Sequence, residues 1–318
     1  MTENKNILEV HHLKKSFTTG KKSFTAVEDI SFSLKTGEVL GIVGESGSGK
    51  STVAKMITHL TEPTAGEIFL MEKDITHARG KNLREIYREM QMIFQTPAES
   101  FDPRCTLGDG IGESLRNMGI SKKETRNRVE KLLLTCGLTP EYADRYPHQV
   151  SGGECQRAAI ARALAVEPRV LICDEATSAL DVTVQKQIME LLQKLKKENQ
   201  LSFLFICHDL ALIRSFAHQI AVMYLGNIVE VIPGEDVAKK SLHPYTQALL
   251  EAQFSIHMDQ NKMIESIESE APSPLDVPHG CPFQNRCEHC MEKCRTIRPV
   301  LTEVEPGHEV ACHYVTEK

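Results

Sequence analysis

Apolar and β-branched positions alternate with polar ones near the start of the chain. Residues 7 to 43 contain three such runs, ILEVHHL, FTAVEDISFSL and EVLGIVG, separated by TTGKK and KTG. Alternation with breaks of this kind is typical of strands joined by turns. We therefore expect strands here, then a helix that begins at Lys50 and ends before EPTAG, and a further strand in EIFL.

The middle of the chain is dominated by helical spacing. Residues 97 to 165 are expected to be mainly helical, with LREIYREM leading in and KKETRNRVEKLLLTCGL repeating its apolar positions at about 3.6 residues. The short apolar runs RVLICDE and LSFLFICHD are typical of buried parallel strands, and an amphipathic segment, VQKQIMELLQKLKKENQ, separates them. Strands that alternate with helices predict an α/β fold with a mostly parallel sheet.

The pattern weakens from about residue 233. Residues 254 to 280, with APSPLDVPHG, have little periodicity and are expected to form a linker. The chain of 318 residues is long enough for roughly two domains. No stretch approaches the roughly 18 to 20 apolar residues that cross a bilayer, because His208 and Asp209 interrupt the nearest candidate at 201 to 213. The start, MTENKNILEV, does not resemble a secretory signal, so we expect a cytoplasmic chain.

Composition narrows the functional classes. Apolar residues make up 41% and charged residues 25% of the chain, which excludes a mainly disordered, collagenous or coiled-coil protein. Lysine and arginine total 37 against 43 acidic residues, a formal charge of −6. That balance disfavours a non-specific nucleic-acid binder, although a local basic patch would be compatible with it.

One glycine-rich segment has the spacing of a phosphate-binding loop. It matches G-x-x-x-x-G-K-[ST] with Gly44, Glu45, Ser46, Gly47, Ser48, Gly49, Lys50 and Ser51. It follows an apolar strand and opens a helix, which is the context that this motif requires. Backbone N–H groups of the loop and the helix N-terminus can hold phosphate oxygens. Lys50 can reach the terminal phosphates, and the Ser51 hydroxyl can bind Mg²⁺.

Two acidic residues end the apolar run VLIC. Asp174 is placed to hold Mg²⁺, directly or through water, and Glu175 is suited to act as the general base for an attacking water. Alone, the pair could equally be two solvated acids at the start of a turn. The upstream phosphate loop favours the catalytic interpretation.

The order of these motifs resembles that of ATP-binding cassette (ABC) ATPases, the motor subunits of transporters. The phosphate loop is followed by Gln95 in MIFQTP, Ser151-Gly152-Gly153-Glu154 before a helix, Asp174-Glu175, Ser178-Ala179-Leu180-Asp181, and His208 in FICHD. The resemblance covers about residues 7 to 240 and implies a P-loop NTPase core with a mixed or parallel sheet. It also implies a helical subdomain at about 97–165. Residues 1–240 would form the nucleotide-binding domain and 241–318 a small cysteine-rich extension.

The resemblance assigns roles to individual residues. Phe17, or its neighbour Phe24, would stack on adenine, and Thr52 would join the phosphate loop in binding ATP. Gln95 would contact Mg²⁺ or the attacking water, and His208 would contact the γ-phosphate. A core phenylalanine, a surface glutamine and a structural histidine are the ordinary alternatives.

The same resemblance implies a dimer of cassettes. Ser151, Gly152 and Gly153 would face the ATP that a second subunit holds, and Asp181 would couple the two sites at their interface. Ser151 and Asp181 also fit a simpler role as helix N-caps, which does not exclude the first. With Glu175 and His208 both present, the chain should hydrolyse its own ATP.

A closer resemblance is to the dipeptide/oligopeptide/nickel importer group. It rests on VGESGSGKST, RYPHQVSGGECQRAAIARAL, Leu242-His243-Pro244-Tyr245-Thr246 and CPFQNRC. It implies uptake of di- or oligopeptides, with nickel or a metal chelate as the alternative cargo. The implied partners are two transmembrane permease subunits, a second related ATPase or another copy of the chain, and an extracytoplasmic solute-binding protein. The permeases would dock on residues 96 to 120, at the cytoplasmic face of the membrane.

Half of the ten cysteines crowd the last 38 residues. Cys281, Cys287, Cys294 and Cys312 have the spacing C-x5-C-x6-C-x17-C, with Cys290 as an additional thiol. Four thiolates can hold zinc or a [4Fe–4S] cluster, and the importer group implies the latter in some members. Free thiols in a packed tail are the alternative, and a tail that senses metal or redox state and gates the ATPase is a further hypothesis.

A function of another class also fits the motifs. A soluble ABC ATPase could act on nucleic acid or ribosomes. Such proteins usually carry two cassettes or a long coiled-coil insert, and this chain shows one cassette and an acidic charge. We therefore expect no nucleic-acid partner.

Overall fold

The computed structural model describes residues 5–20, 22–178, 180–255 and 277–317. The chain divides into two compact units. One is formed mainly by Ala78–Leu204, and the other by Asn6–His77 together with the chain from Phe205 onward. Strand β8 (Ser202–Cys207) crosses the division.

The N-terminal strands form an antiparallel sheet in the second of these units. Its order is β2-β1-β4-β5, with β1 at Asn6–Thr19, β2 at Lys22–Lys35, β4 at Ala65–Leu70 and β5 at Lys73–Asp74. Leu8, Val10 and Leu13 on β1 are fully buried, because the apolar face of this sheet packs inward. The strands expected at the start of the chain are confirmed.

A second sheet in this unit carries the phosphate loop. The completely buried strand β3 (Val39–Val43) runs parallel to β9 (Gln219–Tyr224), which pairs antiparallel with β10 (Asn227–Pro233). β10 also pairs antiparallel with β12 (His308–Val310), and β12 pairs antiparallel with β11 (Thr302–Glu305). This second sheet is therefore mixed, as the family resemblance implies, and the first is antiparallel, whereas the alternation of elements alone predicted a mostly parallel sheet.

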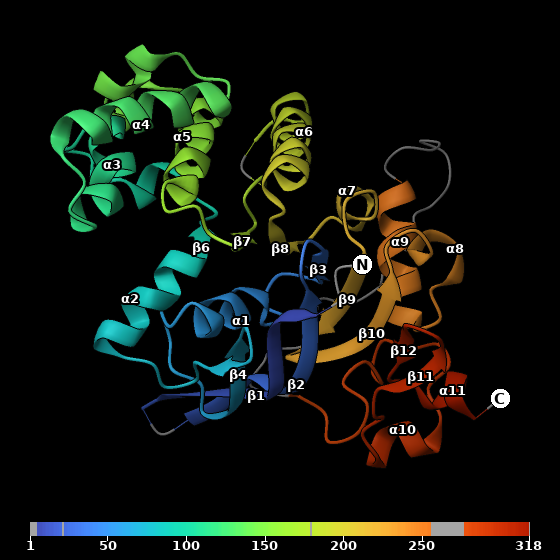
Figure 1. The fold of residues 1–318 in the computed structure, drawn as a ribbon. Coiled ribbons are helices and arrows are strands. Elements are labelled where there is room, and N and C mark those ends of the chain that lie inside the picture. Colours follow the sequence, from blue (N-terminus) through green and yellow to red (C-terminus); the bar gives the residue numbers. More distant parts are fainter. Residues whose placement is uncertain (1–4, 21, 179, 256–276, 318) are drawn as a thin grey trace. The chain divides into compact units, whose positions relative to one another are not determined.

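The described part of this unit also contains helices. They are α1 (Lys50–Ile57), α7 (Leu210–Ile213), α8 (Val237–Lys240), α9 (Pro244–Ser255), α10 (Glu292–Thr296) and α11 (His313–Thr316). The expected start of α1 at Lys50 is confirmed. The last forty residues contain more secondary structure than their sequence pattern predicts, because β12 pairs with β10 and β11 pairs with β12 (Figure 1).

The other unit contains a parallel strand pair and a group of helices. β6 (Met90–Ile93) pairs with β7 (Val170–Asp174) in register from Met90↔Val170 to Ile93↔Cys173. Its helices are α2 (Gly80–Glu89), α3 (Leu107–Asn117), α4 (Lys122–Thr135), α5 (Gly152–Leu164) and α6 (Val182–Asn199), with 3₁₀ turns at Ala98–Ser100, Pro140–Asp144 and Pro147–Gln149. α3, α4 and α5 pack together (Figure 1), so the mainly helical character expected of residues 97 to 165 is observed.

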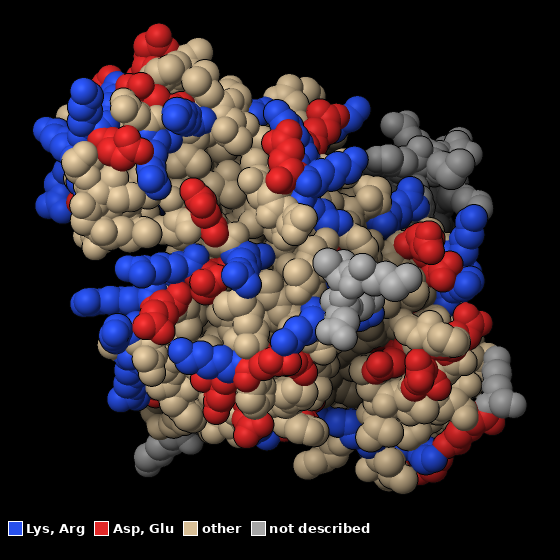
Figure 2. Space-filling model, viewed as in Figure 1, with Lys and Arg blue, Asp and Glu red and all other residues tan. Residues whose placement is uncertain are grey.

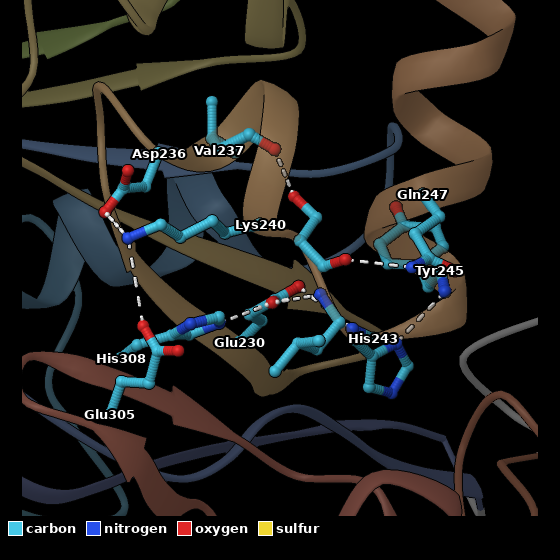
Figure 3. A network of polar contacts seen from close by, with 11 residues as sticks. Glu230, Asp236, Val237, Lys240, His243, Tyr245, Gln247, Glu305 and His308 are labelled. Carbon is cyan, nitrogen blue, oxygen red and sulfur yellow. Dashed lines mark hydrogen bonds and ion pairs between the residues drawn. The ribbon is translucent and has the colours of Figure 1, made fainter.

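A buried carboxylate anchors the C-terminal residues to the sheet (Figure 3). Glu230 on β10 is completely buried and accepts hydrogen bonds from Leu242 N (2.7 Å), His243 N (3.3 Å) and His308 Nε2 (2.8 Å). Lys240 pairs beside it with Asp236 (3.1 Å) and Glu305 (3.8 Å). The network joins β12 and the segment before α9 to one strand.

The expected linker and the most apolar stretch of the chain differ in how far the structure describes them. Most of the linker expected at 254 to 280 lies outside the described residues, at 256–276. Residues 201 to 213 divide between β8 and α7. In the described part of the chain, every helix is too short or too polar to span a bilayer.

Candidate functional site

The glycines of the phosphate loop occupy positions that side chains would obstruct. Gly47 and Gly49 have φ of 80° and 102°, in the left-handed region that glycine adopts without strain. A Cβ atom on Gly44 would lie 2.1 Å from the carbonyl oxygen of Met223 on β9. The loop between β3 and α1 can therefore take this tight course only with glycine at these positions.

Lys50 lies inside the loop. Its side chain is buried, and Nζ donates to the carbonyl oxygens of Gly44 and Glu45, both at 2.8 Å, and to Ser48 Oγ at 3.4 Å. Ser46 is exposed, while Ser51 and Thr52 are half-buried in the first turn of α1. The loop thus folds around a cation next to a helix N-terminus, an arrangement suited to binding phosphate.

Two residues from the C-terminal part of the chain contact this loop. The hydroxyl of Tyr245, on α9, accepts a hydrogen bond from Glu45 N at 2.9 Å. Arg286 pairs with the Glu45 carboxylate through both terminal nitrogens, at 2.8 and 3.0 Å. Sequence reasoning did not place these side chains at the phosphate loop. Tyr245 and Arg286 both lie in segments that carry the family resemblance, but a contact between Arg286 and Glu45, 241 residues apart, leaves no local pattern in the sequence.

The two candidate adenine-stacking rings are neighbours. Phe17 and Phe24 face each other across the β1–β2 hairpin, with ring centroids 5.6 Å apart and planes inclined by 30°. Lys15 Nζ lies 5.0 Å from the centroid of the Phe17 ring. Both rings are half-buried, so a flat apolar surface is partly open to solvent here.

The unit that contains β7 brings Gln95 and Glu175 together. Asp174 ends β7 and is 6% exposed. Glu175 follows it with φ of 47°, an uncommon conformation for a residue with a side chain. Gln95 Nε2 donates to Glu175 Oε2 at 2.7 Å. The backbone turn therefore leaves a carboxylate at the strand end with an amide side chain against it.

Two expected interface residues cap helices in the same unit. The Ser151 hydroxyl accepts from Glu154 N at the start of α5, and Glu154 accepts from Ser151 N in return, a complete capping box. Gly153 could not carry a Cβ atom without approaching Val184 Cγ1 to 2.6 Å. Asp181 caps α6 by accepting from Val184 N at 3.0 Å. These caps are compatible with the dimer roles, which stay predictions.

His208 belongs to the unit that carries the phosphate loop. It follows β8 directly, its side chain is exposed, and the next residue, Asp209, caps α7 by accepting from Leu212 N at 2.9 Å. That unit therefore holds the phosphate loop, Phe17 and His208. The other holds Gln95, Ser151 to Gly153, Asp174, Glu175 and Asp181.

The cysteines of the extension come close together without forming a ligand set. All ten cysteines of the chain are free thiols, and Cys281, Cys294 and Cys312 are buried. Burial, reinforced by the neighbouring cysteines, raises the pKa of Cys281 to about 12 and that of Cys287 to about 11. Within the described residues, however, no group of three or more His, Cys, Asp or Glu side chains could hold a metal ion. The donor chemistry suits a thiolate-bound group, whereas the side-chain geometry does not form its site.

Comparison with known families supports the cassette and the extension separately. A family model described as ABC transporter matches residues 27–178. A second, described as the C-terminal region of oligopeptide/dipeptide transporters, matches residues 229–294. The second match includes most of β10, the Tyr245 segment and Arg286.

Individual relatives agree with these matches. The oligopeptide transport ATP-binding protein OppF of Haemophilus influenzae is 42% identical and covers 98% of both chains. The di/tripeptide transport ATP-binding protein DppF of Pseudomonas aeruginosa is 39% identical, covering 96% of this chain and 95% of that protein. Among solved structures, the dimeric ATP-binding cassette MJ0796, in a post-hydrolysis state bound to ADP and Pi, is 30% identical with a TM-score of 0.66, covering 71% of this chain and 98% of the other. The chain belongs to the ATP-binding proteins of ABC transporters, in the oligopeptide/dipeptide transporter group, and is an ATPase.

Proposed function

We propose that the chain is the ATP-hydrolysing motor subunit of an importer of di- or oligopeptides. The observation that carries the cargo class is the match of residues 229–294 to the C-terminal region of oligopeptide/dipeptide transporters. The relatives named for oligopeptide and di/tripeptide transport support it over nearly the whole chain. Nickel or a metal chelate remains the alternative cargo that the motor motifs alone would allow.

The phosphate loop binds ATP in this proposal. Gly44 to Ser51 surround the phosphates with backbone N–H groups, and Lys50 turns from its loop carbonyls toward the terminal phosphates. Ser51, Gln95 and Asp174 supply the oxygen ligands that Mg²⁺ prefers. When bound, Mg²⁺ neutralises charge that develops on the phosphates. Phe17 stacks on the adenine, with Phe24 packed behind it.

Glu175 accepts the proton of the attacking water. Its Oε2 is already hydrogen-bonded to Gln95 Nε2 at 2.7 Å, which holds the carboxylate in one orientation. His208 contacts the γ-phosphate and keeps the water in line. Catalysis rests on positioning and charge stabilisation, since phosphoryl transfer needs little covalent chemistry from the protein.

Two cassettes form the working motor. Ser151, Gly152 and Gly153 begin α5, and a helix N-terminus with free N–H groups attracts an anion such as the ATP of a second cassette. Asp181 lies at the interface and couples the sites. The dimeric state of the relative MJ0796 supports this arrangement. The second cassette is a related ATPase or another copy of this chain.

The permease surface includes a cavity beside the expected segment 96–120. The cavity has a volume of about 500 Å³ and is lined mainly by α2 and the end of α3, with Arg84, Tyr87, Arg88, Ser114, Asn117 and Met118 among its residues. Tyr87 and Met118 are exposed there, at 36% and 43%. We assign this cavity to a segment of one of two transmembrane permease subunits, at the cytoplasmic face of the membrane. An extracytoplasmic solute-binding protein delivers the peptide.

The surface charge favours this function over a nucleic-acid ATPase. Acidic and basic side chains are interspersed over the face drawn in Figure 2. Nucleic-acid binding requires a concentrated basic surface, and the chain carries a net charge of −6. The domain division proposed for the motor is 1–240 for the cassette, with a helical subdomain at about 97–165, and 241–318 for the extension.

The first test is co-purification from gently solubilised native membranes. We expect two multi-spanning proteins, a related ATPase and a solute-binding protein, identified by mass spectrometry. Met118→Glu places a charge in the cavity and should reduce permease recovery, whereas Leu134→Glu, at a residue 58% exposed on α4, should not. Recovery of ribosomal proteins without membrane partners would contradict the transporter function and leave the ATPase intact.

The cysteine cluster needs a separate test. We propose, from the family resemblance and the thiolate chemistry, that Cys281, Cys287, Cys294 and Cys312 bind a [4Fe–4S] cluster or zinc, which requires their side chains to turn from the described arrangement toward one centre. Metal analysis and the visible absorption of anaerobically purified protein distinguish the two. Protein with neither metal would carry free thiols in a packed tail.

A further inference from the structure

An ion pair joins the phosphate loop to the C-terminal extension, in addition to the hydrogen bond from Glu45 N to Tyr245. The Arg286 side chain is 5% exposed and that of Glu45 is 26% exposed. Both carboxylate oxygens of Glu45 are used, one by each terminal nitrogen of the guanidinium. A bidentate pair of this kind fixes both distance and orientation, unlike a single contact between flexible surface charges.

The surroundings hold Arg286 in place before any nucleotide binds. Its Nη1 also donates to the Tyr224 hydroxyl at 3.3 Å, and the guanidinium lies 5.8 Å from the Tyr224 ring and 5.9 Å from the Phe283 ring. Tyr224, Tyr245 and Phe283 form one aromatic cluster, with centroids 4.6 to 5.4 Å apart. The arginine is therefore pre-organised, at little further entropic cost.

Glu45 needs such a partner because of where it lies. Its carbonyl oxygen accepts from Lys50 Nζ, and its N–H donates to Tyr245, so its backbone sets the course of the loop around the lysine. Its carboxylate is a negative charge within a loop that must attract phosphates. An unpaired carboxylate there would repel ATP, and low solvent access would strengthen that repulsion.

We infer that Arg286 is a positioning residue for nucleotide binding: it neutralises Glu45 and holds the phosphate loop in the conformation that presents Lys50. The inference rests on the proposed ATP site at this loop. It also gives the Tyr245 segment a function, since Tyr245 holds the Glu45 backbone while Arg286 holds its side chain. The extension thereby completes the ATP site of its own chain.

The test measures the dissociation constants of ATP and ADP for the full-length chain without Mg²⁺. Arg286→Gln should weaken ATP binding about 5- to 50-fold, within the range of about 5- to 150-fold that is typical of coupled sites. The loss should be larger for ATP than for ADP, because ATP carries one more negative charge, and it should shrink as salt is raised. The double variant Glu45→Gln/Arg286→Gln should recover most of the lost affinity.

Arg298→Gln is the matched control. Arg298 also lies in the extension, but its contacts are neutral oxygens, Asn227 Oδ1 at 3.3 Å and Pro278 O at 3.4 Å. It should leave the ATP/ADP ratio of affinities unchanged. A purely structural role for Arg286 would lower the melting temperature of Arg286→Gln and affect both nucleotides equally, without rescue by the double variant.

The outcomes separate this inference from the proposed ATP site. Lys50→Ala should abolish ATP binding if the loop binds phosphate, whatever Arg286 does. Wild-type affinity in Arg286→Gln, or a loss that the double variant does not recover, overturns the inference while Lys50→Ala still tests the site. If Arg286→Gln does not fold, Arg286→Lys decides. It retains the charge and loses the bidentate pair, so we expect an intermediate loss, and wild-type affinity for both nucleotides would refute the role.

Discussion

Glu175, the proposed general base, and Glu230 are both glutamates at strands, in different units, and their surroundings differ. Glu175 follows β7, is half-buried, and has one side-chain hydrogen bond, from Gln95. Glu230 lies within β10, is completely buried, and accepts three hydrogen bonds. The first carboxylate has more unused lone pairs, as a general base would require, whereas the second uses three of its roughly four acceptor sites within the fold.

The difference shows how the surroundings of a carboxylate separate chemistry from architecture. A general base must be reachable by its substrate and able to gain a proton. A structural carboxylate must be saturated, since an unpaired buried charge is costly. Variants of the two residues should accordingly fail in different measurements.

The largest effect is expected for Glu175→Gln. The amide cannot accept a proton, so ATP turnover should fall about 10²- to 10⁴-fold, the usual contribution of a general base. ATP binding and ATP-dependent pairing of cassettes should persist, because neither requires proton transfer. Steady-state phosphate release and size-exclusion chromatography with ATP measure the two properties.

The matched control for this change is Glu190→Gln, at an exposed position on α6 in the same unit. Its turnover should equal that of the wild type. Normal ATP turnover in Glu175→Gln would show that Glu175 is not the general base. The two glutamates would then differ in burial and hydrogen bonding but not in a catalytic role.

Glu230→Gln should act on stability. The new NH₂ group faces one of three N–H donors, and leaving a buried donor unsatisfied costs about 1–3 kcal/mol in the free energy of unfolding. Glu235→Gln, at an exposed residue two positions beyond β10, should change it by less than about 0.5 kcal/mol. Urea unfolding followed by circular dichroism measures both. Equal stability of the two variants would show that the network in Figure 3 contributes little.

The sequence predicts the two glutamates unequally. Glu175 is predicted as the general base because contiguous motifs, each confined to a few residues, keep a recognisable order along the chain. The role of Glu230 has no such signal, since its partners are 12, 13 and 78 residues away and contact it only in the folded structure. Arg286 was missed for the same reason. Spacing also drew attention to the four cysteines, although the structure gathers them without making a metal site.

His243 is a second buried polar residue with a structural role, and it should make the stability of the fold depend on pH. It is 1% exposed, and burial lowers its pKa from 6.5 to about 3. Its Nδ1 accepts from Tyr245 N at 3.0 Å, which requires the neutral ring. Between about pH 6.5 and 3 the unfolded chain therefore binds one more proton than the folded chain, and the stability that this neutral histidine contributes is lost as the pH falls.

His243→Asn should flatten that dependence. The asparagine oxygen can still accept from Tyr245 N, but it does not titrate, so the slope of unfolding free energy against pH should decrease by about 1.4 kcal/mol per pH unit between pH 6 and 4. Urea titrations of both proteins across this range give the slopes. Parallel slopes would mean that protonation of His243 is not linked to unfolding.

The smallest expected effect compares two helix caps in one unit. Ser151 and Ser121 both accept an N–H hydrogen bond at 3.3 Å from a glutamate three residues on, at the starts of α5 and α4. Each change to alanine should cost about 1 kcal/mol of stability. If Ser151 also faces the ATP of a second cassette, Ser151→Ala should decrease ATP turnover by the dimer more than Ser121→Ala does. Equal ATP turnover of the two variants at equal stability would show that Ser151 acts only as the N-cap of α5, because an N-cap hydroxyl that does not contact the nucleotide cannot affect its hydrolysis directly.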